Sequence, residues 1–424
     1  MKNKYRQTGK NKSLSPKSKW LTLCAMMLAF GLASCVDYSD EATTVSAKVR
    51  LTLPEEFTSN SGLEGRTVVL MAQNGSRLTS TTDAEGVASF SNIVPDVYTV
   101  SASWELTQAE YAAATGDNVV NEGAVVSGNL NNWLVKGEET IALPTVLAIN
   151  RSLVIGKIYY AGSKDANKKN YLAGQFIELY NQSDKAINVA GLYIGLLESN
   201  ATPAYTLDNL HEKFSDSVVV CKQVFRIPAD KAHALKPGES LVITNSAIDH
   251  TAKVATERNL LTADYEAKFP TGRIVNNPST PALEQKFSSF DKIPNMNLLQ
   301  SGPCGVVIFR TEKDVTKFDK VYSYGKTKGS LWLVVPKRYV IDGVDILKYN
   351  SKSGGADVAT KHLYNDIDGG YATISAVNGY NGEVVYRKTS TRKGKDGHRI
   401  LQDTNNSLND FKLSTTINIR EYDE

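Results

Sequence analysis

Short apolar runs alternate with polar residues along most of the chain. In AKVRLTL (47–53) apolar side chains recur at every second position, the spacing of a strand with one buried face, and RTVVLMAQ (66–73) is a second such run. Clusters of Gly, Asn, Asp and Ser separate the runs, as turns do. Helical spacing is rare: TQAEYAAATG (107–116) is the best case and 252–269 a weaker one. The pattern predicts an all-β protein, and roughly 390 residues after the N-terminal segment are enough for two domains.

The first group of predicted strands contains the turn Thr82-Asp83-Ala84-Glu85-Gly86. Asp83 suits the first position of such a turn, and Gly86 tolerates the positive φ that it needs. This run resembles the prealbumin-like, carboxypeptidase-regulatory type of β-sandwich, with its pattern T-D-x-x-G-x-a-x-F followed by P-G-x-Y-x-V. Asp96 stands where that family has Gly, so this turn is expected to differ. The resemblance implies that residues 44–150 form a β-sandwich of the spacer type.

A second group of strand patterns centres on GQFIELYNQSDKAINVAGLYI, residues 174–194. It resembles the lamin-tail domain, an immunoglobulin-like β-sandwich, and further segments at 227–245, 302–310 and 339–347 match that family. The resemblance implies a second sandwich at 151–424, and therefore two β-sandwich domains in all. The positions that match the central motif are Phe176, Ile177, Glu178, Leu179, Asn181, Ser183, Ile187, Asn188, Val189 and Gly191, with the expected aromatic displaced to Tyr193.

An insert at residues 246–301 is much longer than the link that a plain lamin-tail domain has there. Loops of this length are usually functional or disordered, and aromatic side chains are common anchors of a binding surface. We interpret the insert as a recognition loop that a short link can replace without loss of stability. The predicted binding residues are Tyr265, Phe269, Phe287 and Phe290.

The N-terminal segment has a different pattern from the rest. Residues 1–19 carry seven basic side chains and no acid, and Trp20 through Leu32 is almost wholly apolar. A basic stretch, a short apolar stretch and then small residues are typical of a secretory signal peptide. The apolar run is shorter than the ~20 residues that a membrane-spanning helix needs. We expect residues 1–34 to be a signal peptide.

Leu32-Ala33-Ser34-Cys35 follows this apolar run. It resembles the lipobox of bacterial lipoproteins, in which the chain is cut before a cysteine that carries a diacylglycerol. The resemblance implies that Cys35 is the lipidated first residue of a membrane-anchored protein; an ordinary signal peptide with a chance cysteine is the alternative. The acids of linker 35–43 resemble an export tag for the outer face of the outer membrane, with a solvated linker as the alternative. We expect an outer-membrane lipoprotein on the cell surface; the acids are Asp37, Asp40 and Glu41.

Removal of the signal peptide changes the net charge. The whole chain has 48 basic and 45 acidic residues, a net charge of +3. Without the seven basic residues of 1–19, 41 basic residues face 45 acidic ones, a net charge of −4. Nucleic-acid binding is not expected, because it needs clustered Lys and Arg. The basic run 386–399 is interpreted as a solvated loop rather than a phosphate-binding track.

Four cysteines are present, of which Cys24 lies in the expected signal peptide and Cys35 is the lipidation site that the resemblance implies. An oxidising compartment permits a disulfide between the other two, Cys221 and Cys304, without requiring one. Neither belongs to a CxxC pair, so a redox or zinc role is not expected.

Catalytic motifs are sparse. The sequence has no HExxH, GxSxG or P-loop, and no GxGxxG after a strand. Asp366 and Asp368 in YNDIDGGY are interpreted as loop residues rather than a glycosidase pair. Glu178 is interpreted as a register or surface group. No enzyme activity is expected, and the five histidines are His211, His233, His250, His362 and His398.

The tail segment 397–413 is rich in side-chain oxygens. Such oxygens can ligate calcium, but the spacing of an EF-hand is missing, and turn chemistry is the preferred interpretation. We expect no cofactor and no metal ion. The residues concerned are Asp403, Asn405, Asn406, Asn409 and Asp410.

The whole layout resembles an uncharacterised family of bacterial surface lipoproteins that combine these two modules and accompany outer-membrane TonB-type receptors. The resemblance implies a non-enzymatic binding or accessory protein whose partner is an outer-membrane protein or a surface ligand. Two alternatives stay open. One is a structural or adhesive component that contacts protein or glycan through the 246–301 insert. The other is a hydrolase, since lamin-tail modules elsewhere occur beside nucleases and phosphatases.

Overall fold

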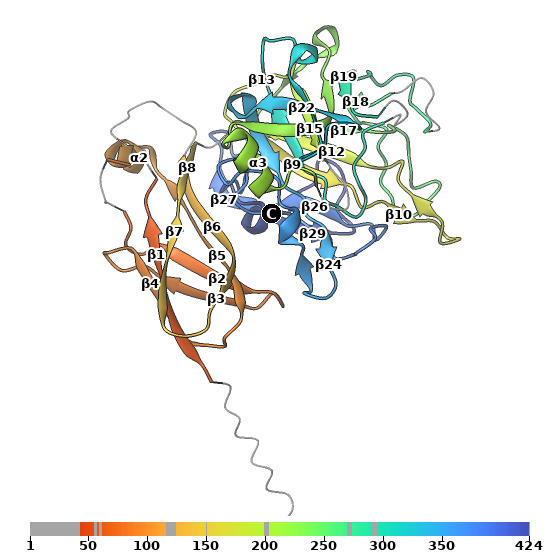
Figure 1. Cartoon of the computed structure of the whole chain (residues 1–424). Helices are drawn as coiled ribbons and strands as arrows, with labels where there is room; N and C mark the ends of the chain where they lie inside the picture. The colour runs from red at the N-terminus through yellow and green to blue at the C-terminus, as the bar shows by residue number, and fades with distance from the viewer. Residues whose placement is uncertain are drawn as a thin grey trace, which may run out of the picture. The chain divides into compact units, whose positions relative to one another are not determined.

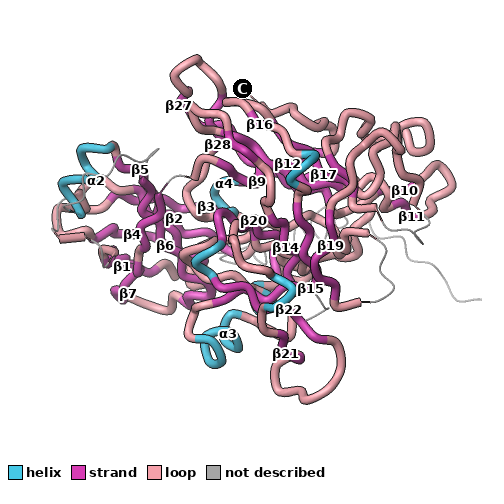
Figure 2. Tube along the Cα trace, turned by 90° about the horizontal axis from the view of Figure 1, so that it is seen from above, coloured by secondary structure: helices cyan, strands magenta, loops and turns pink. Residues whose placement is uncertain are grey.

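The chain folds as an all-β protein, as the alternating pattern predicts (Figures 1 and 2). Val45–Glu424 is a compact unit, and the N-terminal segment that is expected to be a signal peptide, together with Cys35, lies outside the described part of the chain. No helix among the described residues is long and apolar enough to cross a membrane. The computed structural model describes residues 43–54, 57–58, 62–115, 124–149, 151–198, 203–268, 274–290 and 295–423.

The first eight strands form two sheets, with orders β4-β1-β7 and β3-β2-β5-β6-β8. In β1 every second residue is buried, so the predicted alternation marks the face that packs on the other sheet. The helix expected at 107–116 is confirmed as α2, Gln108–Thr115. The strands are β1 Val45–Thr52, β2 Thr67–Ala72, β3 Arg77–Thr81, β4 Val87–Ile93, β5 Val97–Leu106, β6 Ala124–Leu134, β7 Glu139–Pro144 and β8 Val146–Ile149.

The remaining strands build a larger sandwich of a six-stranded sheet, β18-β17-β12-β9-β26-β29, and a seven-stranded sheet, β21-β22-β15-β14-β20-β23 with β19 also on β15. Five of its strands are β9 Leu153–Tyr159, β12 Phe176–Asn181, β14 Tyr193–Leu197, β17 Ser240–Thr244 and β20 Val306–Phe309. The others in these sheets are β15 Val218–Arg226, β18 Tyr265–Glu266, β19 Glu284–Ser288, β21 Lys320–Tyr322, β22 Leu331–Pro336, β23 Val340–Val344, β26 Val384–Arg387 and β29 Phe411–Ser414.

Short elements connect these sheets. Small antiparallel pairs are β10 Ser163–Lys164 with β11 Asn170–Tyr171, β13 Ile187–Asn188 with β16 Ala234–Leu235, β24 Tyr349–Asn350 with β25 Gly355–Ala356, and β27 Thr389–Lys393 with β28 Arg399–Leu401. The helical turns are α3 Leu207–Phe214, α4 Ser407–Asp410, η1 Ala229–Lys231, η2 Val315–Lys317, η3 Lys337–Tyr339 and η4 Val358–Thr360.

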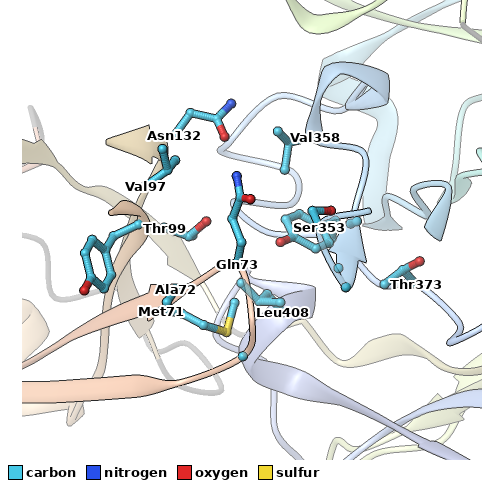
Figure 3. A pocket seen from close by; sticks show the side chains of 16 residues that line it. Met71, Ala72, Gln73, Val97, Thr99, Asn132, Ser353, Val358, Thr373 and Leu408 are labelled. Atoms are coloured by element: carbon cyan, nitrogen blue, oxygen red, sulfur yellow. The ribbon is translucent and has the colours of Figure 1, made fainter. Parts of the chain in front are cut away.

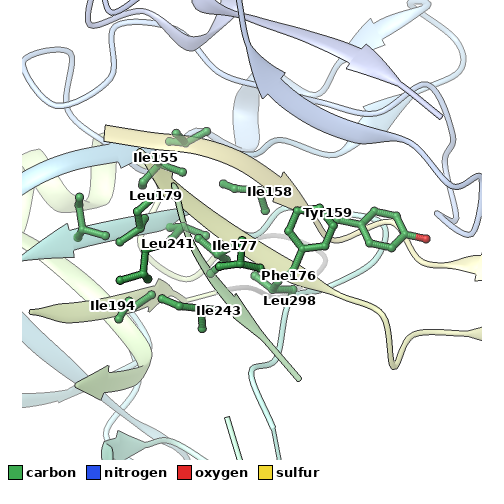
Figure 4. Packing of buried hydrophobic residues seen from close by; sticks show 14 of the residues in the cluster. Ile155, Ile158, Tyr159, Phe176, Ile177, Leu179, Ile194, Leu241, Ile243 and Leu298 are labelled. Carbon is green, nitrogen blue, oxygen red and sulfur yellow. The ribbon is translucent and has the colours of Figure 1, made fainter. Parts of the chain in front are cut away.

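The main core of the second sandwich lies between its two sheets. Figure 4 shows side chains of β9, β12 and β17 packed together, with Ile194 of β14 and Leu298 beside them. A second apolar cluster covers the other face of the seven-stranded sheet and includes Leu210 of α3 and Leu363. Because both faces of this sheet are covered, every residue of β14 is buried.

The 246–301 insert belongs to the fold rather than to a separate loop. Leu260, Tyr265 and Leu298 are 0%, 1% and 3% exposed within the main core. The backbone of β18 pairs with β17, and β19 pairs with β15. The expectation of a replaceable loop is therefore wrong, because a short link would remove core side chains and two strands.

The second helix expected, at 252–269, is also absent from the described residues 252–268. This stretch forms turns and β18 instead. The amide of Asp264 donates to the carbonyl of Val242, and that of Ala267 to the carbonyl of Thr244. Backbone hydrogen bonds to the neighbouring strand thus take the place of those that the expected helix would have formed.

Candidate functional site

An open groove of about 530 Å³ lies on the seven-stranded sheet of the second sandwich. Its floor comes from Val218 at the start of β15 and Val334 on β22, and its walls from the η2 and η3 turns. We call it the Phe318 groove. It is lined by Val218, Lys313, Asp314, Lys317, Phe318, Asp319, Val334, Pro336, Arg338 and Tyr339.

Two half-buried rings give the Phe318 groove an aromatic wall. Phe318 directly follows η2, Tyr339 ends η3, and their ring planes lie at 15° with centroids 6.0 Å apart. The guanidinium of Arg338 lies 4.8 Å from the centre of the Tyr339 ring and donates to its hydroxyl at 3.3 Å. That hydrogen bond lowers the pKa of the Tyr339 phenol. Such stacking fixes the orientation of the planar guanidinium of Arg338, which can then donate hydrogen bonds to a carboxylate.

Cations outnumber acids along the rim of the Phe318 groove. Lys313, Lys317 and Arg338 face Asp314 and Asp319. Lys317 and Asp314 form an exposed pair at 3.8 Å, while in the part of the chain that is described Lys313 and Arg338 have no carboxylate within ion-pair distance. The groove therefore combines an apolar floor with two cations available to an anionic ligand.

Phe287 and Phe290, two of the predicted binding residues, lie on the same face of the seven-stranded sheet as this groove. Both are half-buried against the cluster that also contacts Phe318, and Phe290 meets Trp332 edge-on at 5.7 Å. Tyr265 is 1% exposed, and its hydroxyl donates to the carbonyl of Lys231, so it is a core residue and not a surface anchor. Phe269 lies outside the described residues.

The two remaining cysteines are free thiols, so the disulfide that the sequence permitted is not formed. Cys221 belongs to the outer apolar cluster, and Cys304 to the main core. Burial raises the pKa of both thiols. Buried cysteines of this kind are chemically inert.

The oxygen-rich tail segment surrounds the guanidinium of a buried arginine. Arg387 on β26 is 2% exposed and pairs with Asp342, Asp403 and Asp410 at 3.0, 3.2 and 3.2 Å. Asn406 caps α4 by accepting from the amide of Leu408. The described residues contain no group of three His, Cys, Asp or Glu side chains that could hold a metal ion.

The polar residues considered for catalysis have structural partners. His362 lies 2.7 Å from Asp345, whose other oxygen accepts the amides of His362 and Leu363. Asp366 pairs with Lys337 at 2.6 Å, whereas Asp368 accepts backbone amides, among them that of Ser407. Glu178 is fully buried and paired with Lys157 on the neighbouring strand, so of the two expected roles, register or surface group, the surface role is wrong.

The other histidines show no shared site. His211 is exposed beside Asp216, and His233 stacks on Tyr265 at 6.3 Å. His250 bonds the Tyr171 hydroxyl at 2.6 Å, and His398 lies beside Asp396.

A smaller cavity of about 220 Å³ is the second candidate site (Figure 3). Its labelled lining includes Gln73, Thr99, Asn132, Ser353 and Thr373, which are polar but uncharged. With neither an ionisable cluster nor a cation in its lining, it offers less to a specific ligand than the Phe318 groove.

Sequence reasoning missed Phe318, Arg338 and Tyr339. The available signal was the run Pro336-Lys337-Arg338-Tyr339, in which two cations precede an aromatic residue directly after an apolar strand.

Comparison with known proteins finds a family model that is similar to part of this chain. Residues 236–417, within the second sandwich, match the family model "Protein of unknown function (DUF4876)". A solved DUF4876 family protein from Bacteroides thetaiotaomicron is 20% identical and has a TM-score of 0.55, and the match covers 87% of this chain and 94% of that one. That likeness shows a shared fold. No curated protein matches the chain.

Two further solved structures resemble the chain weakly. Fervidolysin from Fervidobacterium pennivorans, a keratinolytic enzyme related to subtilisin, is 14% identical over 34% of this chain and 26% of its own, with a TM-score of 0.16. A DUF3823 family protein from Parabacteroides merdae is 10% identical over 44% of this chain and 92% of its own, also with a TM-score of 0.16. We infer nothing from them.

Proposed function

We propose that the protein is a lipid-anchored, non-enzymatic binding protein of the outer cell surface, and that the Phe318 groove binds a short, carboxylate-bearing oligosaccharide. The pairing of Arg338 with the Tyr339 ring, 4.8 Å from its centre, carries this proposal. A sugar ring presents an apolar C–H face to an aromatic wall, while its carboxylate accepts from a guanidinium and from Lys313.

The size and position of the groove suit this role. About 530 Å³ is within the roughly 300–1,000 Å³ of small-ligand sites. Its walls are turns held by rigid strands of the sheet, the common setting for binding loops. Anchorage through Cys35 and a role beside an outer-membrane TonB-type receptor rest on the sequence resemblance and complete the proposal.

Calorimetric titration with two forms of one polymer tests the groove. Oligogalacturonate should bind, and its methyl-esterified form, which has the same rings without the charges, should bind at least tenfold more weakly, because a charged hydrogen bond contributes about 1.5–3 kcal/mol. Arg338→Ala should weaken oligogalacturonate binding by a similar factor. Lys326→Ala, on an exposed turn away from the groove, is the control.

Equal affinity for both polymers, or full affinity in Arg338→Ala, would overturn the assignment of the groove. If oligogalacturonate did not bind but another acidic sugar bound in a manner that depends on Arg338, the assigned sugar would be wrong and the assigned site would stand.

A further inference from the structure

A buried lysine of the second sandwich lies beside a side-chain amide. Lys222 on β15 is 1% exposed, and its Nζ donates to Oδ1 of Asn297 at 3.4 Å. A lysine amine and a side-chain carboxamide are the two reactants of an amide exchange, in which the amine nitrogen replaces the amide nitrogen. Here the two groups are in contact.

The backbone that carries Asn297 is clamped from both sides. Its amide donates to Oε1 of Gln223 at 2.7 Å, while the Nε2 of Gln223 donates to the carbonyl of Asn295 at 3.0 Å. The side chain of Asn245 accepts from the amide of Met296 at 2.8 Å and donates to its carbonyl at 3.1 Å. Fixing two reacting groups in contact removes most of the entropic cost of their reaction.

A buried acid interacts electrostatically with the same lysine. Glu198, directly after β14, is 1% exposed, and its carboxyl accepts the amide of Ala204 at 2.7 Å. Burial raises the pKa of Glu198, and burial lowers the pKa of Lys222 to about 8. Both shifts run in the direction that favours an attack of the amine on the amide.

We propose that Lys222 and Asn297 join in an intramolecular isopeptide bond, with Glu198 carrying the proton. The neutral amine attacks Cγ of Asn297 and forms the Nζ–Cγ bond. Glu198 takes a proton from the attacking nitrogen and gives one to the amide nitrogen. The Cγ–Nδ2 bond breaks with its electron pair on nitrogen, and one ammonia leaves; nothing is oxidised or reduced.

The bond would tie β15 to the end of the 246–301 insert. It closes a ring from residue 222 to residue 297. The unfolded chain would then have fewer accessible conformations, which stabilises the folded state. This inference does not depend on the Phe318 groove, because neither the residues nor the readout are shared.

Peptide mass spectrometry of the full chain, purified from membranes and alkylated, tests the bond. Trypsin does not cut after an acylated lysine, so residues 214–226 should stay whole and appear joined to residues 293–310. The joined species should weigh one ammonia less than the two peptides together. Complete recovery of separate peptides 214–222 and 293–310 would overturn the proposal.

Lys361 is the internal control for digestion. It is also buried, but its Nζ donates to the backbone carbonyls of Asp368 and Gly370 at 2.7 and 2.9 Å. Trypsin should therefore cut after Lys361 while it fails after Lys222.

Two variants separate the roles. Lys222→Arg keeps the charge and should lose the joined peptide entirely. Glu198→Gln should reduce its fraction by tenfold or more, with folding checked by circular dichroism. An undiminished fraction in a folded Glu198→Gln protein would refute the role of Glu198, and a joined peptide in Lys222→Arg would refute the bond.

Discussion

Nζ of Lys157 lies 2.9 Å from Oε1 of Glu178, and neither side chain has any exposed surface. The two residues are direct partners across β9 and β12. Ser240 donates to the same carboxylate at 2.6 Å, and the ring of Tyr422 lies 3.5 Å from the ammonium. The glutamate of the central strand motif therefore serves the core of the sheet, and not a site.

Removing one charge of this pair should be costly. Glu178→Gln leaves the ammonium of Lys157 buried without its counter-charge, a loss of about 3–5 kcal/mol in the free energy of unfolding. Urea denaturation measures it. Glu239→Gln, which removes an exposed charge from the pair with Lys236, is the control and should leave the midpoint unchanged. A wild-type midpoint for Glu178→Gln would show that the pair contributes nothing.

The Arg387 cluster predicts how stability changes with pH. Three buried carboxylates share this guanidinium, and burial raises the pKa of Asp410 from 3.8 to about 7. Between these pH values the folded protein holds a proton that the unfolded chain releases. Stability from Asp410 is therefore full below about pH 4 and is lost as the pH rises through 7.

Asp410→Asn should flatten this profile. The amide is neutral throughout, so the fall in melting temperature between pH 5 and pH 8 should be smaller than in the wild type. Thermal unfolding monitored by circular dichroism at several pH values measures the slope. Asp208→Asn, on the exposed side of α3, should keep the wild-type profile. An unchanged slope in Asp410→Asn would mean that this carboxyl is ionised in the folded protein at neutral pH.

Lipidation at Cys35 remains a prediction from the sequence. Cys35→Ala should abolish metabolic labelling with palmitate and release the protein from the membrane, because the thiol that receives the lipid is gone. Cys24→Ala, in the same N-terminal segment, should leave labelling intact. Protease added to intact cells should remove the folded part. Persistent labelling in Cys35→Ala would contradict the anchor, and full protection in intact cells would contradict surface display.

The strands could be predicted where their burial alternates or their apolar run is long, as in β1 and β9. The polar core residues could not. Lys222 and Gln223 interrupt the apolar run of β15 and suggest an exposed edge, yet both are buried, because segments distant in sequence supply their hydrogen bonds. The candidate groove was also missed because it depends on contacts between distant segments. Phe318 and Tyr339 lie side by side only because the fold brings two short turns together.

The insert offers the sharpest test of how the fold differs from the sequence expectation. Leu260 and Leu261 are neighbours, but Leu260 is 0% exposed in the main core and Leu261 is 53% exposed. Leu260→Ala should cost about 2–5 kcal/mol, since it removes buried methyl groups and leaves a cavity. Leu261→Ala makes the same chemical change at the surface and should stay within about 0.5 kcal/mol of the wild type. Urea denaturation of the two variants measures the difference.

Replacement of 246–301 by a Gly-Ser link should go further and prevent cooperative folding, because β18, β19 and their core side chains are removed together. If Leu260→Ala matched Leu261→Ala, or the shortened chain melted within a few degrees of the wild type, the insert would be a dispensable loop after all.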